Sequence, residues 1–286
     1  MKYKGYTGII AHINLTSRTI QSLPLSEKVA EEYTGGVGIA AKITSEMVKP
    51  LMDPFDEDNP LIFMTGPLTG TVIPWSGRHC VATISPLTGI WGESYAGGTW
   101  ARELKKAGLD GIVVTGKSDS LCFIKVIDQT ITIEDAPFLK GKDTYATEKL
   151  LRDSCDEQVK VAAIGEAGER CVRFAAVMHD GPASRAAGRC GVGAVMGSKN
   201  LKAIAVKGTG SPQLFDREGL TQSIKEVMPE LVNNPEHRLQ KANAVFSMFM
   251  DDRRHGGNNW RDGELHPFKE AFLKDIEKHV RHGKPY

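Results

Sequence analysis

The sequence predicts an α+β fold that is followed by a helical segment. Strand-like runs outnumber helical ones over the first two-thirds of the chain, and they do not alternate with helices as in a parallel sheet. After Gly210 glycine becomes rarer, charged residues become more frequent, and three stretches show helical spacing. We therefore predict an α+β domain over residues 1–208, and an incomplete helical segment over residues 209–286 that leads into a further domain.

The first half of the α+β domain is predicted to begin with a β-hairpin over residues 7–23. Ser26 is a good N-cap for a short helix, which Gly35 and Gly36 would end. The further elements expected here are helices over 27–33 and 39–48, strands over 61–65, 77–84 and 90–94, a helix that ends at Gly108, and a strand over 111–116.

The second half is predicted to contain another hairpin, in which the strands 121–127 and 130–134 turn at Asp128 and Gln129. A helix over 143–153 and strands over 159–164, 172–178 and 201–206 complete this half. In the helical segment we expect helices over 216–231, interrupted at Pro229, and over 237–253 and 267–281.

Composition excludes several classes of protein. The 286 residues are 41% hydrophobic and 25% charged with a net charge of +1, whereas a nucleic-acid binder usually has a basic excess. No apolar run is long enough to span a membrane, and no signal peptide is visible. The five cysteines are odd in number and lack C-x-x-C spacing, which indicates a reducing compartment. We expect a cytoplasmic protein that binds neither nucleic acid nor membranes.

The stretch from His179 to Gly208 carries the strongest functional signal. Arg185 and Arg189 stand four residues apart among eight glycine, alanine and serine residues. Small residues let backbone N–H groups approach a ligand, and a guanidinium group fits a phosphate with two parallel hydrogen bonds. This combination predicts a surface for a large, flat, phosphorylated anion, to which Arg78 would add a third guanidinium group. The plainer alternative is a glycine-rich turn with solvated arginines.

Other motifs give weaker signals. The segment Gly191–Gly197 has only a superficial likeness to a dinucleotide-binding fingerprint, because no strand directly precedes it. Neighbouring strand residues such as His79 and Cys80 point to opposite faces, so they do not form a catalytic pair. His179 and Asp180 could form a polar pair, although a turn at Asp180 is the more frequent use of such a sequence.

Several longer motifs together resemble the N-terminal domain of the aldehyde:ferredoxin oxidoreductase family. The resemblance extends from residue 5 to about residue 208 with few gaps. The segments that carry it are Thr65–Gly70, Ser85–Gly89, Asp110–Val114, Ile164–Glu169, Arg185–Arg189 and Gly191–Ile204.

The resemblance implies a two-part β-sheet base, flanked by helices, on which a tungsten bis-pterin sits; some members would hold molybdenum. Two dithiolene groups would bind the metal, so this chain needs no metal ligand and no catalytic residue of its own. Tyr95 stands where a member of the family has asparagine, so a backbone contact is expected there. The cofactor-binding residues implied by position are Arg78, Tyr95, Gly97, Arg185, Ala186, Gly188 and Arg189.

The family resemblance also implies an activity for the parent enzyme. It would oxidise a small aldehyde to a carboxylic acid and pass the electrons through an iron–sulfur cluster to ferredoxin or another electron carrier. In the family the cluster cysteines follow a segment like Lys284–Tyr286, so we expect a longer parent protein, an inactive chain on its own, and a homo-oligomer as one option. Two alternatives remain open, namely a non-catalytic cofactor-binding or assembly module and a nucleotide-binding protein.

Overall fold

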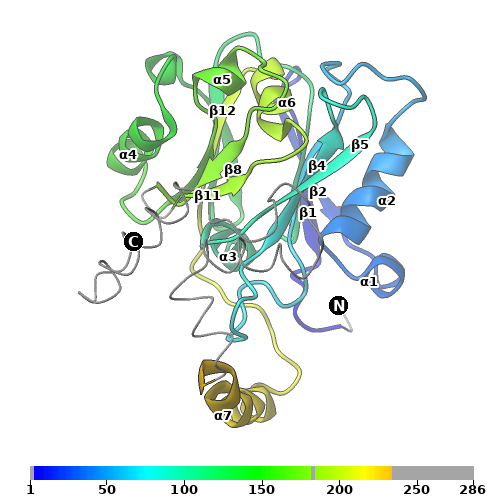
Figure 1. The fold of residues 1–286 in the computed structure, drawn as a ribbon, viewed down its shortest axis with the longest axis vertical. Coiled ribbons are helices and arrows are strands. Elements are labelled where there is room, and N and C mark those ends of the chain that lie inside the picture. Colours follow the sequence, from blue (N-terminus) through cyan, green and yellow to red (C-terminus); the bar gives the residue numbers. More distant parts are fainter. Residues whose placement is uncertain (1–2, 182–183, 234–286) are drawn as a thin grey trace, which may run out of the picture. The chain divides into compact units, whose positions relative to one another are not determined.

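The computed structural model describes residues 3–181 and 184–233 and divides the chain into two compact units, residues 1–215 and 216–286. The first unit contains two six-stranded mixed sheets with helices around them (Figure 1). This architecture confirms the predicted α+β class and its two-part base. Whether 1–208 and 209–286 are independent domains stays a prediction.

The first sheet is built from the N-terminal half of this unit. Its strands are β1 (Ile9–Asn14), β2 (Thr19–Pro24), β3 (Leu61–Met64), β4 (His79–Ile84), β5 (Trp91–Ala96) and β6 (Gly111–Thr115), in the spatial order β2-β1-β6-β3-β4-β5. β1 and β6 are parallel, and the other neighbours are antiparallel. The predicted hairpin at the N-terminus is confirmed, with Ile9 opposite Pro24 and Asn14 opposite Thr19.

The second sheet follows in the chain. Its strands are β7 (Cys122–Ile127), β8 (Thr130–Asp135), β9 (Lys160–Ala163), β10 (Val177–His179), β11 (Arg185–Ala187) and β12 (Leu201–Lys207), in the order β11-β10-β9-β12-β7-β8. β7 and β12 are parallel, and the other neighbours are antiparallel. The hairpin predicted across Asp128 is confirmed, and Asp128 has the positive φ that such a turn needs.

The two sheets have the same connectivity. When the six strands of each half are numbered in chain order, the first strand pairs with the second in a hairpin and with the sixth in parallel. The third strand lies beside the sixth, the fourth beside the third, and the fifth beside the fourth. The first unit is therefore a topological duplication, with β1–β6 in one copy and β7–β12 in the other.

Helices cover the outer faces of the sheets and fill the space between them. α1 (Glu27–Tyr33) and α2 (Val37–Met47) cover the first sheet, and α4 (Thr144–Ser154) packs on β9 of the second (Figure 1). α3 (Trp100–Lys106) and α6 (Val192–Ser198) lie in a core that both sheets share. α3 follows β5 but packs on β9 and β12, whereas α6 follows β11 and packs on β3 and β4 as well as on β12. Each half therefore places a helix against the other half's sheet.

The shared core is centred on Trp100 of α3. This side chain is fully buried, its Nε1 donates to the carbonyl oxygen of Ile204 at 3.0 Å, and its ring lies 5.4 Å from that of Phe63. Because Phe63 belongs to the first sheet and Ile204 to the second, Trp100 contacts both sheets. The other short elements are the 3₁₀ helix Pro137–Leu139 and α5 (Glu166–Glu169), which packs against α6.

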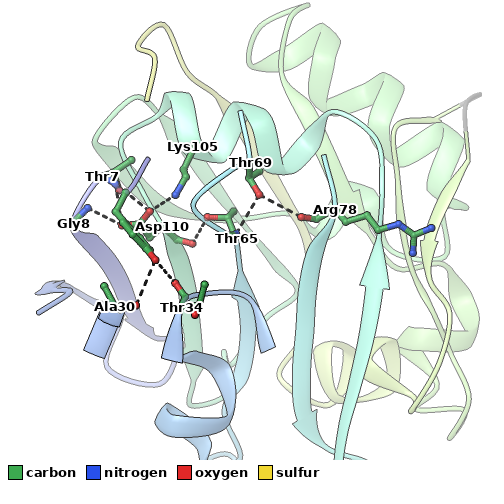
Figure 2. Close-up of polar contacts among 11 residues, drawn as sticks. Thr7, Gly8, Ala30, Thr34, Thr65, Thr69, Arg78, Lys105 and Asp110 are labelled. Atoms are coloured by element: carbon green, nitrogen blue, oxygen red, sulfur yellow. Dashed lines mark hydrogen bonds and ion pairs between the residues drawn. The ribbon is translucent and has the colours of Figure 1, made fainter. Parts of the chain in front are cut away.

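A buried carboxylate, Asp110, fixes the start of β1 and the turn after β3 (Figure 2). Its side chain accepts from the backbone N–H groups of Thr7 and Gly8, at 3.1 and 2.7 Å, and forms an ion pair with Lys105. The backbone carbonyl oxygen of Asp110 accepts from the backbone N–H of Thr65 at 2.9 Å and from the hydroxyl group of Thr65 at 2.7 Å. Burial lowers the pKa of Lys105, and the charge of Asp110 opposes that shift.

Local sequence signals account for most element limits. Ser26 caps α1 as predicted, since its Oγ accepts from Val29 N at 3.2 Å, and Asp143 caps α4 in the same way through Ala146 N at 2.7 Å. The strand predicted over 172–178 is wrong in extent, because β10 begins only at Val177. The chain before it turns back, with Val172 N donating to Ala167 O.

The second unit is described only over its first helix. This helix, α7 (Arg217–Asn233), continues through Pro229, so the predicted interruption there is wrong. The helices predicted over 237–253 and 267–281 lie outside the described residues. Among the helices that the structure describes, none is both long and apolar enough to cross a membrane.

Candidate functional site

The predicted cofactor-binding residues come together where the two sheets meet edge to edge. β5 ends the first sheet, β11 ends the second, and these two strands contact each other. Beyond β11 the chain continues along β5, since Arg189 N donates to Ser94 Oγ at 3.0 Å and Cys190 Sγ donates to Glu93 O at 3.3 Å. This junction draws on segments that lie about a hundred residues apart in the sequence.

Arg78 joins this junction through the register of the first sheet. It directly precedes β4, whose first residue His79 pairs with Ala96, so Arg78 lies opposite Gly97. Its carbonyl oxygen accepts from Thr69 Oγ1 at 3.4 Å, which ties it to the turn that Asp110 fixes. Figure 2 shows that the guanidinium group of Arg78 points away from the buried Asp110 cluster.

Arg185 reaches the same place from the second sheet. Its Cγ would lie 3.0 Å from a Cβ built on Gly98, and its Cδ would lie 3.8 Å from one built on Gly97. The arginine stem therefore runs over these two glycines. We call the seven residues at this junction the arginine surface; they are Arg78, Tyr95, Gly97, Arg185, Ala186, Gly188 and Arg189.

The arginine surface is open to solvent. Gly97 is half-buried, and the other six residues are exposed. Three exposed arginines thus lie around the β5–β11 junction beside glycine and alanine backbone, and guanidinium groups are suited to binding a phosphorylated anion. Partial burial raises the pKa of Tyr95 to about 12, and Cys80 and Glu93 add to the shift, so this phenol keeps its proton at neutral pH.

Two glycines of the arginine surface have no reason within the chain to be glycine. Neither Gly97 nor Gly188 has a positive φ. A Cβ on Gly97 would meet only Arg185 Cδ at 3.8 Å, and one on Gly188 only Ala186 Cβ at 3.7 Å, which are ordinary contacts. By contrast, Gly98 has a φ of +91°, and a Cβ on it would overlap the carboxylate of Asp180. The space above the backbone is therefore open at Gly97 and Gly188 and closed at Gly98.

Part of the glycine-rich stretch serves packing rather than the surface. The prediction treated the small residues from Ala186 to Ser198 as one ligand-facing region, but Val192–Gly197 are buried in α6. A Cβ on Gly193 would overlap Ala176 O, and one on Gly197 would overlap Gly168 O. These glycines let α6 approach its neighbours, so from this stretch only Arg185, Ala186, Gly188 and Arg189 belong to the arginine surface.

Asp180 fixes the loop that carries Gly97. Its carboxylate accepts from Thr99 N at 2.5 Å and from Thr99 Oγ1 at 2.8 Å. Sequence reasoning placed Asp180 in a turn, and it has the positive φ of such a position. Its link to a loop of the other half was not predicted, because nothing local in the sequence indicates which loop lies beside it.

A buried histidine pair was also missed. His79 and His179 approach to 3.2 Å between their Nε2 atoms, and both side chains are buried. The only sequence signal that bears on them is strand alternation, which places His79 on the face opposite Cys80, as found. Their pairing depends on the contact between the sheets. Within residues 3–181 and 184–233, no group of three or more His, Cys, Asp or Glu side chains could hold a metal ion.

Comparison with known proteins places this geometry in a family. The family model described as "Aldehyde ferredoxin oxidoreductase, N-terminal domain" matches residues 10–208, which include both sheets and the arginine surface. The chain belongs to this family. Its membership confirms the resemblance that the sequence motifs indicate.

Relatives within the family are oxidoreductases from archaea. The chain is 44% identical over 232 residues to the tungsten-containing aldehyde ferredoxin oxidoreductases of Pyrococcus abyssi and Pyrococcus horikoshii, a match that covers 81% of this chain and 38% of each relative. It is 31% identical over 291 residues to the aliphatic sulfonate oxidoreductase, WOR-like subunit, of Pyrococcus furiosus, covering 96% of this chain and 46% of that one.

A solved structure shares the fold. It is titled as the active site complex BamBC of benzoyl coenzyme A reductase with 1,5-dienoyl-CoA, and it superposes with a TM-score of 0.78 at 36% identity, over 81% of this chain and 36% of that one. The chain thus spans less than half the length of each of these relatives.

Proposed function

We propose that the chain is the N-terminal, tungstopterin-binding part of an oxidoreductase that oxidises aldehydes to carboxylic acids with ferredoxin as electron acceptor. The observation that carries this proposal is the placement of Gly97 and Gly188. Each directly follows the fifth strand of its half, β5 or β11, and neither is required by the chain's own packing. Two sheets of the same topology, each followed after its fifth strand by a glycine with free space above it, fit a cofactor that contains two pterins.

The donor groups of the arginine surface suit the anionic ends of such a cofactor. Arg78, Arg185 and Arg189 would neutralise the pterin phosphates and fix their positions, and Tyr95, Ala186 and the two glycines would contribute backbone groups. Because the Tyr95 phenol stays protonated at neutral pH, it adds no negative charge there. When bound, the metal and its pterins supply two-electron redox chemistry, and molybdenum in place of tungsten would use the same protein groups.

The remaining parts of the activity are assigned to chain outside these 286 residues. They include the iron–sulfur cluster, the groups that contact the aldehyde, and the surface that meets ferredoxin or another electron carrier. On this proposal the chain alone is inactive, works in the cytoplasm and is compatible with a homo-oligomer. The named relatives support the class of reaction, because most of those cited are aldehyde ferredoxin oxidoreductases.

A second candidate has support from one relative and one structure. The sulfonate oxidoreductase relative is named as a subunit, and the solved structure belongs to a coenzyme A reductase complex. The same floor could therefore serve a different substrate, or act as a cofactor-binding subunit beside a catalytic partner. A substrate panel of aldehydes, sulfonates and aromatic thioesters, assayed with the complete protein, separates these functions.

The cofactor assignment is tested by replacing Arg185 and Arg189 with alanine in the complete protein grown with tungstate. We expect tungsten and pterin content to fall together, by about tenfold or more if each arginine contributes one charge-assisted contact. Arg170→Ala is the matched control, since Arg170 is an exposed arginine that pairs with Glu166 on α5. Unchanged tungsten content in the double variant would refute the assignment.

A further inference from the structure

Two buried histidines link the two sheets next to the arginine surface. His79 is the first residue of β4 and His179 is the last residue of β10, and their Nε2 atoms are 3.2 Å apart. They are 2% and 1% exposed. The ring of Trp100 packs against both, with centroid distances of 5.0 and 5.6 Å. The pair is therefore a polar contact between the halves, enclosed by the shared core.

The hydrogen bond requires that at least one of the two rings is neutral. One imidazole donates its Nε2–H and the other accepts at Nε2, whereas two imidazolium rings would place two donors against each other. Burial lowers the pKa of both side chains, that of His179 to about 4, and the charge of His179 lowers the pKa of His79 further. Two carboxylates lie near the histidine pair. Asp180 follows His179 in the chain, and Glu148 lines the same small cavity as His179.

Stability alone does not explain these histidines. The Nδ1 atom of His79 is buried and has no hydrogen-bond partner among the described residues. A buried polar atom without a partner costs free energy, and apolar side chains of similar size would fill the space without that cost. A single directional hydrogen bond in a core can instead select one arrangement of the elements that carry it.

The elements that carry this bond also carry the arginines. His79 directly follows Arg78 in the chain. His179 is paired with Arg185 in the antiparallel register of β10 and β11. The His79–His179 hydrogen bond thus connects the neighbour of Arg78 in the first sheet to the strand partner of Arg185 in the second sheet. Asp180 adds to the same connection, because it holds the Gly97–Thr99 loop of the first half against β10 of the second.

We infer that the His79–His179 hydrogen bond is a positioning device, which sets the spacing between Arg78 and Arg185 for a ligand that carries two phosphate groups. The histidines are positioning residues, since their buried rings act through the strands. This inference rests on the proposed function, because it concerns the same surface and the same phosphorylated cofactor.

The test compares three substitutions of His79 in the complete protein grown with tungstate. The amide nitrogen of glutamine occupies the place of a histidine Nε2, that of asparagine ends near Nδ1, and leucine has no donor. We expect His79→Gln to retain tungsten and pterin, and His79→Leu and His79→Asn to lose about tenfold, the effect of one misplaced charge-assisted contact. Equal cofactor content in the glutamine and asparagine variants would overturn the inference.

A destabilised control separates positioning from loss of folding. Val126→Ala removes two methyl groups from a buried residue of β7, a strand that pairs with β8 and β12 and not with β10. Cofactor content is compared between this variant and the His79 variants at matched thermal midpoints. If Val126→Ala loses as much cofactor as His79→Leu at the same midpoint, the histidines have only a structural role.

Arginine variants in the same series distinguish failure of this inference from failure of the proposed function. If Arg78→Ala and Arg185→Ala keep their tungsten, the cofactor assignment itself is wrong. If the arginine variants lose tungsten but His79→Leu keeps it, the assignment stands and the positioning role is excluded. Where His79→Leu does not accumulate as folded protein, the comparison of glutamine with asparagine alone decides.

Discussion

Gly97 and Gly188 are two glycines that the fold itself does not require. At most glycines of this junction a side chain would strain the backbone or overlap a neighbour, so packing explains them. At these two positions neither cause applies. Alanine should therefore be tolerated by the fold and rejected by the cofactor.

We predict that Gly97→Ala and Gly188→Ala leave the thermal midpoint within about 2 °C of the parent, because each new methyl group would make only ordinary contacts. Both variants should nevertheless lose tungsten and pterin, as measured by elemental analysis and released-pterin fluorescence. Gly193→Ala is the control, since its methyl group would overlap Ala176 O and cost about 1–3 kcal/mol of stability. Full cofactor content in the first two variants would contradict the close-approach argument.

The buried histidine pair gives the protein a defined response to acid. The unfolded chain binds a proton at His179 below its usual pKa of 6.5, whereas the folded chain does so only near 4. Stability should thus fall as the pH drops from about 6.5 towards 4, by up to about 1.4 kcal/mol per pH unit for each such histidine. His79 and His12, whose pKa values burial also lowers, act in the same direction. Glu148 acts in the opposite direction, because burial raises its pKa.

Urea unfolding at several pH values between 7 and 4.5 checks this expectation. In His179→Leu the slope of stability against pH should be smaller by about one proton than in the parent. The difference between the two slopes cancels the contribution of surface carboxylates. Parallel slopes would show that His179 titrates normally in the folded state.

At the scale of elements, sequence patterns predicted most strands because each is a short apolar or alternating run bounded by a turn. The two hairpins, α1 and α4 follow from local signals that involve only a few residues, such as the caps Ser26 and Asp143. α6 was missed because its residues Gly193 and Gly197 favour neither helix nor strand, and the helix packs against α5 and strands that lie far away in the sequence. β11 has three residues and is defined by its partner β10, which no local pattern shows.

The candidate site residues were named from residue type and family resemblance, but their arrangement could not be predicted. The arginines and glycines could be named from sequence, since their chemistry is independent of their neighbours. Their convergence, the Asp180 link and the His79–His179 bond depend on contacts between β4, β5, β10 and β11, which lie far apart in the chain. The duplication of topology was hidden for the same reason, because strand order is conserved between the halves while the side chains differ.

The start of β1 depends on one buried ion pair. Asp110 satisfies Lys105 and two backbone N–H groups, so Asp110→Ala would leave a cation and two donors buried without partners. We predict a loss of about 3–5 kcal/mol in the free energy of unfolding, measured by urea titration. The double variant Lys105→Met/Asp110→Leu should lose less, because it removes the unpaired charge. A double variant as unstable as Asp110→Ala would show that the ion pair itself stabilises the fold.

At the scale of the whole molecule, residues 1–215 form one compact unit whose core contains residues of both sheets. We predict that this segment, expressed alone, folds and unfolds in a single transition, with the same midpoint by near-ultraviolet and far-ultraviolet circular dichroism. The shared core is the reason, since loss of one sheet would expose the buried faces of α3 and α6. Two separate transitions, one for each sheet, would contradict this expectation.

Because α3 and α6 each pack on the other half's sheet, neither half of the first unit has a complete core of its own. A polypeptide that contains only one half would have a sheet without the helix that the other half supplies, so buried apolar residues of that sheet would face solvent. A chain severed in the loop between β6 and β7 should accordingly yield two pieces that recover structure only when mixed.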